Sequence, residues 1–353
     1  MRPANLAEFI ADRTSVSLRG FRLGPAGAQQ LTRTRAMLQV TYLDLEGNAI
    51  GDEGLRMLLG SVVTRNVVDL GLCDNGLSGA AIGELAASKL AGKLSSLDVS
   101  NNGLGPDDVA ALLPALAGVG ELDLAENPIG DAGAALLAPA LAEVGILRLS
   151  WCGIGPRGLA ALLAGPLPRD ASVMLGHNPL GDEGVAALVR SELRPSSLGL
   201  EYCGITAAGL AQLVEGGYVG PTAWIDLCGN PIDDVACLHG RTFDCVQLCA
   251  TPLRQPTIAK LRASVKGRIV ASAPVAASHY LACPYCRTEV DEQVPRCRGC
   301  RRDWTRDALV EERRGRDNFS QVCPHCEAGN DPFASACRAC GSWLPRGDVA
   351  IVR

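Results

Sequence analysis

The sequence predicts an α/β fold with short parallel strands inside a curved array and short helices outside, followed by a small metal-stabilised domain. Three observations support this prediction. A leucine-rich pattern recurs every 25–27 residues through most of the chain, and apolar residues recur at helical spacing between the copies. Two sets of four cysteines with identical internal spacing lie towards the C-terminus.

The repeated pattern has the form LxLxxN/CxL, as in VTYLDLEGNAIG and VGELDLAENPIG. Alternate residues of a strand point to the same side, so the two leucines predict a short strand with one buried face. The following Asn or Cys is placed to satisfy backbone groups of the next turn. This position is occupied by Asn48, Asn75, Asn102, Asn127, Cys152, Asn178, Cys203 and Asn230. Weaker copies at both ends bring the total to about ten units.

The segments between the strands predict short helices. GDEGLRMLLG and GPDDVAALLPAL carry Leu and Ala at spacings of three and four residues, which gives a helix one apolar face. GDEG occurs twice, at residues 51–54 and 181–184, and we expect its acidic residues to cap their own helix. One strand–helix unit cannot bury its apolar face alone, so neighbouring units must stack.

Residues 13–254 resemble ribonuclease-inhibitor-type leucine-rich repeats. The resemblance rests on the recurring LxLxxN/CxL segments and the helical stretches between them. It implies a leucine-rich-repeat horseshoe with parallel strands inside and helices outside. The inner surface of such a horseshoe is a general binding surface.

Polar positions between the strand leucines should line this inner surface. They are acidic in the N-terminal half, which would suit a basic patch on a protein partner. The alternative is that these aspartates only keep the sheet face soluble. Trp151, Tyr202 and Trp224 are either contact anchors or partly packed residues. The residues predicted to contact a partner are Tyr42, Asp44, Asp98, Glu121, Asp123, Arg148, Trp224 and Asp226.

Two cysteine sets predict two structural zinc sites. CPYC and CRGC are separated by ten residues, and CPHC and CRAC repeat this arrangement 40 residues later. Four thiolates complete the tetrahedron that zinc prefers, which leaves no open position for hydrolysis. Neither segment has enough apolar residues for a core, so each metal must supply roughly 10–16 kcal/mol of folding energy. Disulfides are the alternative. The predicted ligands are Cys283, Cys286, Cys297, Cys300, Cys323, Cys326, Cys337 and Cys340.

This region resembles the double zinc ribbon family, and the resemblance covers residues 283–343. The second ribbon also has the spacing of Ran-binding-protein-type fingers, but Gln321 stands where those fingers carry a Trp. A short helix is expected near residues 307–314. The predicted domains are a solenoid with caps at 1–262, a linker at 263–282, the double zinc ribbon at 283–343 and a tail at 344–353. A further metal site or free thiols are the two readings of Cys228, Cys245 and Cys249.

Composition and motifs favour binding over catalysis. The chain of 353 residues is 47% hydrophobic but only 4% aromatic, has a net charge of −5, and contains four dispersed histidines. It shows no apolar run that predicts a signal peptide or a membrane helix, so we expect a cytoplasmic protein without a membrane partner. The predicted function is a non-catalytic protein–protein interaction scaffold, with the ribbons as a structural or anchoring module. The alternatives are a nucleic-acid-associated regulator acting through the ribbons and a thiol-dependent enzyme.

Overall fold

The computed structural model describes residues 6–221 and 223–271, together with four short strands at 278–282, 310–314, 321–322 and 329–330. The chain divides into two compact units. The first comprises Met1–Gln247 and Lys260–Ile269, and the second comprises Leu248–Ala259 and Val270–Arg353.

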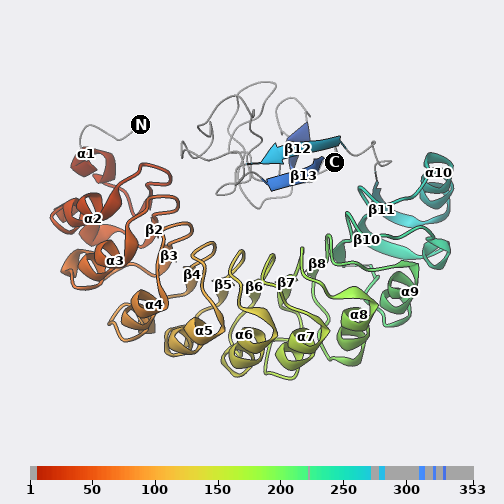
Figure 1. Cartoon of the computed structure of the whole chain (residues 1–353), viewed down its shortest axis with the longest axis horizontal. Helices are drawn as coiled ribbons and strands as arrows, with labels where there is room; N and C mark the ends of the chain where they lie inside the picture. Colours follow the sequence, from red (N-terminus) through yellow and green to blue (C-terminus); the bar gives the residue numbers. More distant parts are fainter. Residues whose placement is uncertain are drawn as a thin grey trace. The chain divides into compact units, whose positions relative to one another are not determined.

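A single sheet of short strands organises the repeats. In the described part of the chain, eleven strands are hydrogen-bonded side by side in chain order, and helices cover the outer side of the first unit (Figure 1). Strands β1 to β10 pair in parallel. The strands are β1 (Ser15–Ser17), β2 (Tyr42–Asp44), β3 (Asp69–Gly71), β4 (Ser96–Asp98), β5 (Glu121–Asp123), β6 (Ile146–Arg148), β7 (Ser172–Met174), β8 (Ser197–Gly199), β9 (Trp224–Asp226), β10 (Thr242–Gln247) and β11 (Lys266–Val270).

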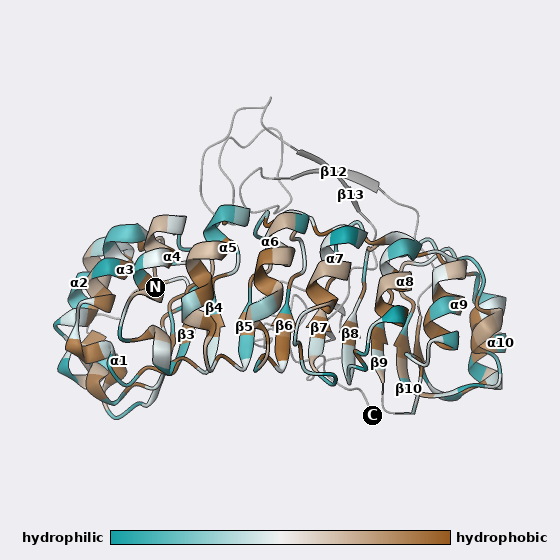
Figure 2. Ribbon diagram, turned by 90° about the horizontal axis from the view of Figure 1, so that it is seen from below, coloured by the Kyte–Doolittle hydropathy of each residue, from teal (hydrophilic) through white to brown (hydrophobic). Residues whose placement is uncertain are grey.

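Short helices connect the strands, as the leucine and alanine spacing predicts. Figure 2 shows hydrophobic and hydrophilic residues on the same helices, as expected for helices with one buried face. The helices are α1 (Leu6–Ile10), α2 (Gly24–Thr32), α3 (Gly51–Leu59), α4 (Gly79–Ala86), α5 (Pro106–Leu112), α6 (Gly130–Leu137), α7 (Pro156–Leu163), α8 (Gly181–Arg190), α9 (Ala207–Glu215) and α10 (Gln255–Ser264).

The core lies between strands and helices. The central leucine of each LxL strand is almost fully buried, as at Leu97, Leu122 and Leu147. Burying a leucine side chain stabilises a fold by about 1.5–3 kcal/mol. Because each strand contributes only a few such residues, this burial becomes large only when successive units stack.

A ladder of buried and half-buried asparagines joins successive repeats. The amide nitrogen of Asn127 donates to the carbonyl oxygens of Val99 and Leu124, both at 3.0 Å. Its oxygen accepts from the backbone amides of Asn102 at 3.1 Å and Leu104 at 2.9 Å. Bonds of this kind to the preceding repeat are also made by Asn48, Asn75, Asn102, Asn178 and Asn230. The predicted role of the repeated asparagine is confirmed.

Cysteine takes this role in two repeats. The thiol of Cys152 donates to the carbonyl oxygen of Leu124 at 3.3 Å, and its sulfur accepts from the backbone amide of Asn127. The sulfur of Cys152 accepts no hydrogen bond from the second amide, which belongs to Ile129. The amide of Ile129 therefore donates to the carbonyl oxygen of Asn127 in its own repeat, at 2.8 Å. Burial raises the pKa of Cys152 to about 12, so the thiol stays protonated and can donate.

The prediction that the GDEG aspartates cap their own helices is wrong. The carboxylate of Asp182 in α8 accepts from the amide at 2.9 Å and the hydroxyl at 2.6 Å of Thr206, the residue before α9. Asp52 makes the same two bonds to Ser78 before α4. Both aspartates are the second residue of their helix rather than the residue before it, and the next repeat lies beside them. These carboxylates therefore tie successive helices together.

Strands also occur where the sequence predicts other structure. The range 263–282, predicted as a linker, contains β11 and β12 (Ser278–Ala282). The range 307–314, where a helix was expected, contains β13 (Val310–Arg314), which pairs antiparallel with β12. Strand β14 (Gln321–Val322) pairs antiparallel with β15 (Gly329–Asn330). Among the described residues, no helix is long and apolar enough to cross a membrane.

Candidate binding surface

All eight residues predicted to contact a partner lie in two adjacent rows on the strand side of the array. The middle row consists of the last residue of each strand from β2 (Asp44) to β10 (Gln247), and the strand register places these residues opposite one another. The middle row includes Asp44, Asp98, Asp123, Arg148 and Asp226, and the neighbouring row includes Tyr42, Glu121 and Trp224. The predicted alignment of these positions is confirmed. Tyr42 is the most exposed of the large hydrophobic residues here, with 42% of its surface accessible.

The aspartates of the middle row also hold the end of each strand. Asp44, Asp98 and Asp123 each accept a hydrogen bond from the backbone amide two residues later, at 2.9 Å. Asp226 does the same with the amide of Cys228. Aspartate commonly closes turns in this way. These residues therefore do more than keep the sheet face soluble, because they fix the start of the turn that follows each strand.

Burial, together with neighbouring carboxylates, disfavours the charged forms of the aspartates in this row. Asp98 and Asp123 lie directly opposite each other on β4 and β5. Burial raises the pKa of Asp123 to about 7, and the charge of Asp98 adds to this effect. Burial also raises the pKa of Asp98. The row is thus less negative at neutral pH than its composition indicates, and an approaching cation would favour proton release.

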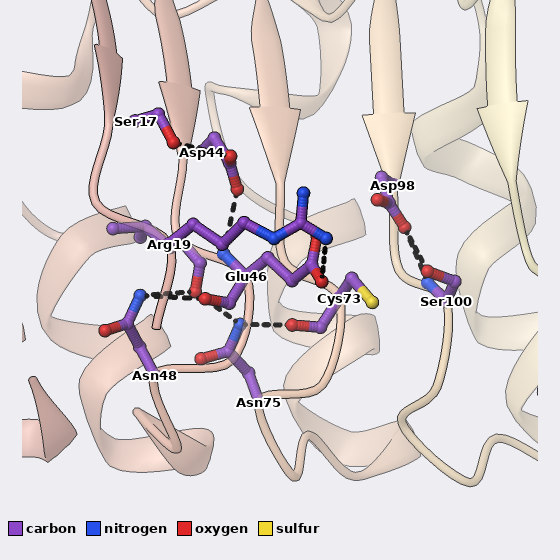
Figure 3. A network of polar contacts seen from close by, with 10 residues as sticks. Ser17, Arg19, Asp44, Glu46, Asn48, Cys73, Asn75, Asp98 and Ser100 are labelled. Atoms are coloured by element: carbon purple, nitrogen blue, oxygen red, sulfur yellow. Dashed lines mark hydrogen bonds and ion pairs between the residues drawn. The ribbon is translucent and has the colours of Figure 1, made fainter. Parts of the chain in front are cut away.

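Two ion pairs bridge successive repeats on the same face. Arg148 on β6 pairs with Glu121 on β5, and about a third of each side chain is exposed. Arg19 pairs with Glu46 near the N-terminal end, where Asp44 also accepts from the hydroxyl of Ser17 at 2.8 Å (Figure 3). Such partly exposed pairs contribute little stability, about 0–1 kcal/mol each. Their importance lies in fixing the positions of charged groups on the surface.

A second acidic pair lies towards the C-terminal half of the array. The carboxylate of Glu201 occupies the space that a side chain at Gly176 or Gly199 would need. Burial raises the pKa of Glu201 to about 8, and the charge of Asp226 adds to this effect. Glu201 is therefore largely protonated at neutral pH and contributes little negative charge.

Three aromatic rings stack in the turns that follow β6, β7 and β8. The ring centroids of Trp151 and His177 are 3.9 Å apart and their planes differ by 11°. The rings of His177 and Tyr202 are 4.5 Å apart, with planes at 15°. Burial lowers the pKa of His177 to about 4, so this ring is neutral at neutral pH. Trp151 is 51% exposed. Of the three predicted aromatic anchors, Trp151 and Tyr202 share this stack, whereas Trp224 lies on β9.

The repeats match a known family. Residues 40–59, 93–113, 121–138, 146–163 and 172–189 match the model of a family described as leucine-rich repeat. These segments are leucine-rich repeats. The match covers part of the array that the strands and the asparagine ladder define, and the ladder continues beyond the matched segments at both ends.

Several solved structures resemble the chain at low sequence identity. An internalin (inlF) from Listeria monocytogenes is 16% identical, with 75% of this chain and 84% of that chain covered and a TM-score of 0.42. The Arabidopsis receptor kinase HAESA, solved with the peptide hormone IDA and the co-receptor SERK1, is 16% identical, with 77% and 48% covered and a TM-score of 0.41. The yeast Rad7 and Elc1 complex gives 12% identity, 66% and 75% coverage, and a TM-score of 0.37. These similarities do not indicate what the chain binds. A search of curated proteins gives no match.

The predicted zinc ligands, Cys283, Cys286, Cys297, Cys300, Cys323, Cys326, Cys337 and Cys340, lie outside the described residues. The described ranges contain no group of three or more His, Cys, Asp or Glu side chains that could hold a metal ion. Cys228, Cys245 and Cys249 form no disulfide bond within this described part of the chain.

Sequence reasoning missed the stack because it treated each aromatic residue separately. Trp151, His177 and Tyr202 each precede the repeated Asn or Cys by one residue. All three have positive φ, between 52° and 61°, which the turn imposes at this position. Residues at one position of a stacked repeat lie side by side, so aligning this column would have brought the three rings together.

Proposed function

We propose that the chain is a non-catalytic scaffold that binds a protein partner on the strand side of its leucine-rich repeats. The observation that supports this most strongly is the register of the sheet. It places polar and aromatic side chains at equivalent positions on successive strands, on a backbone fixed by the asparagine ladder. A rigid surface of this kind lowers the cost of ordering on binding.

We further propose that the eight C-terminal cysteines bind two zinc ions and that the zinc-bound region serves as a structural or anchoring module. The donor set supports this, because each group of four cysteines supplies the thiolates that zinc prefers. The spacing repeats without change in the second group. Native mass spectrometry of the purified chain should show two zinc ions. A chain without zinc, with these cysteines oxidised, would contradict this proposal and leave the repeat surface untouched.

Partner capture with charge-neutral variants tests the binding surface. Replacing Asp98 and Asp123 by Asn removes the charge but keeps an oxygen that can accept from the amide two residues later. We expect a genuine partner to bind this double variant more weakly, with the loss reduced at high salt. Asp107→Asn is the matched control, because Asp107 is exposed on α5 and lies on the helix side. Zinc-loaded, full-length protein is the bait for all variants.

The pH dependence of binding provides a second test of this surface, because the pKa of Asp123 is raised to about 7. If the partner surface is basic, binding favours the ionised forms of Asp98 and Asp123, so affinity should rise from pH 6 to pH 8. The Asn variants should lose this dependence. The proposal fails if every captured protein binds the double variant and the control equally well. Salt-sensitive binding of DNA or RNA that persists in the double variant would instead favour a nucleic-acid role for the C-terminal region.

A further inference from the structure

The aromatic stack is held in place by the backbone of the turns. The amide of Trp151 donates to the carbonyl oxygen of Gly176 at 2.9 Å, and the amide of His177 donates to that of Glu201 at 2.7 Å. The amide of Tyr202 donates to the carbonyl oxygen of Cys228 at 2.8 Å. Each ring therefore projects from an equivalent, fixed position in three successive repeats. The near-parallel ring planes follow from this repetition.

The two ends of the stack differ. At the Tyr202 end the next repeat has Gly229, and a Cβ atom there would overlap the tyrosine ring. The stack thus ends against backbone on this side. At the other end Trp151 covers His177 with one face and still leaves half of its surface exposed. The preceding repeat has Glu126, which is exposed, at the same position. The stack is closed at Tyr202 and accessible at Trp151.

An exposed carboxylate beside Trp151 favours positive charge. Glu126 follows β5 and is exposed. It is the carboxylate that matters here, because Glu121 on β5 already pairs with Arg148 and burial raises the pKa of Asp123 to about 7. His177 behind the indole is neutral at neutral pH, so the stack itself adds no cation. A planar cation can stack on an indole face and pair with a carboxylate beside it. The phosphates of a nucleotide would be repelled by this carboxylate.

We infer that the exposed face of Trp151 binds an arginine side chain of the protein partner, with the guanidinium stacked on the indole and paired with Glu126. This inference rests on the proposed function only in assigning the arginine to a protein. Arginine fits better than lysine, because its planar group extends the ring stack and can pair with a carboxylate through two N–H groups. The site lies in the turns that follow β5 and β6, next to the strand side of the repeats.

Small probes test the site without a partner. The indole N–H signals of the full-length, ¹⁵N-tryptophan-labelled chain are followed by NMR, and the Trp151 signal is assigned by its loss in Trp151→Phe. The probes are N-acetyl-arginine methylamide, the matched lysine and citrulline compounds, and AMP. We expect a saturable shift of the Trp151 signal with arginine. Binding of citrulline, which has the same shape without the charge, should be about fivefold weaker.

Variants test the carboxylate of Glu126 separately from the indole face of Trp151. Glu126→Gln should weaken arginine binding about threefold and leave citrulline binding unchanged. Glu143→Gln, at an exposed position outside the strand rows, should change neither. No saturable shift with arginine, equal binding of arginine and citrulline, or tighter binding of AMP would overturn the inference. Because no partner is used, this test can fail while partner capture succeeds, and the reverse also holds.

Discussion

Removing the side chain of Asn127 tests how the repeats are joined. This residue is fully buried, and its amide group makes its four shortest bonds to the carbonyl oxygens of Val99 and Leu124 and the amides of Asn102 and Leu104. A buried polar group left without a partner costs about 1–3 kcal/mol. The full sum for four groups would be an overestimate, because the turn can relax and admit water. We expect Asn127→Ala to lower the free energy of unfolding by about 3–5 kcal/mol.

Asn127→Cys should be much milder, since the array already uses cysteine in this role. The thiol can donate to the carbonyl oxygen of Val99 in the preceding repeat, as the thiol of Cys152 donates to that of Leu124, and its sulfur can accept from one amide. The amide of Leu104 can then donate to the carbonyl oxygen of Asn102, as the amide of Ile129 donates to that of Asn127. We expect a loss of about 1–2 kcal/mol. Asn66→Ala is the control, because Asn66 makes one exposed bond, to the carbonyl oxygen of Leu38.

Urea denaturation followed by far-ultraviolet circular dichroism measures these differences. Hydrogen exchange then shows whether the loss is local, since the amides of Asn102 and Leu104 should lose protection first in Asn127→Ala. The reasoning is refuted if Asn127→Ala costs less than about 1 kcal/mol, or if Ala and Cys at this position are equally damaging.

Three further predictions follow from single contacts. Glu201 is largely neutral in the folded chain up to about pH 8 but ionises near its ordinary pKa of 4.5 when unfolded. The free energy of unfolding therefore falls as pH rises from about 4.5 to about 8. Thermal unfolding of Glu201→Gln should match the parent near pH 4.5 and show a gain on the order of 2 kcal/mol at pH 8; a gain independent of pH would contradict this. Asp182→Ala should cost about 1–2 kcal/mol and deprotect the first turn of α9 in hydrogen exchange, because it removes both bonds to Thr206, whereas Glu183→Ala should not. Gly229→Ala should cost about 1–3 kcal/mol, since φ is +70° and the new methyl group would strike the tyrosine ring; unchanged stability together with an unchanged ring-stacking signal in NMR would refute this.

The repeat period made the fold predictable. Leucines two residues apart and a buried Asn or Cys specify the same local structure in every unit, so strand positions and register follow once the copies are aligned. The predicted positions from Asp44 to Asp226 are therefore aligned by the strand pairing. At the end of the array this information is lost. The segment of β11, KGRIV, has no LxL pattern, and the sheet continues past residue 262.

Contacts between repeats could be predicted only in part. The role of the asparagines was predicted because an amide in a turn needs local partners. The reach of Asp182 to Thr206 was not, because a helix-start aspartate has its own helix as the nearest apparent partner. The altered pKa values of Asp123 and Glu201 also depend on burial and on a neighbouring strand, neither of which is visible in a linear sequence.

Hydroxyl-radical footprinting tests most directly whether the strand side of the repeats is the binding surface. Tyr42 and Trp151 are exposed on or beside that surface, whereas Leu136 is 40% exposed on α6, on the helix side. Side-chain oxidation is measured by mass spectrometry for the full-length chain alone and with a captured partner. The proposed function predicts that the partner protects Tyr42 and Trp151 and leaves Leu136 unchanged. Protection of Leu136 with continued oxidation of Tyr42 and Trp151 would contradict it.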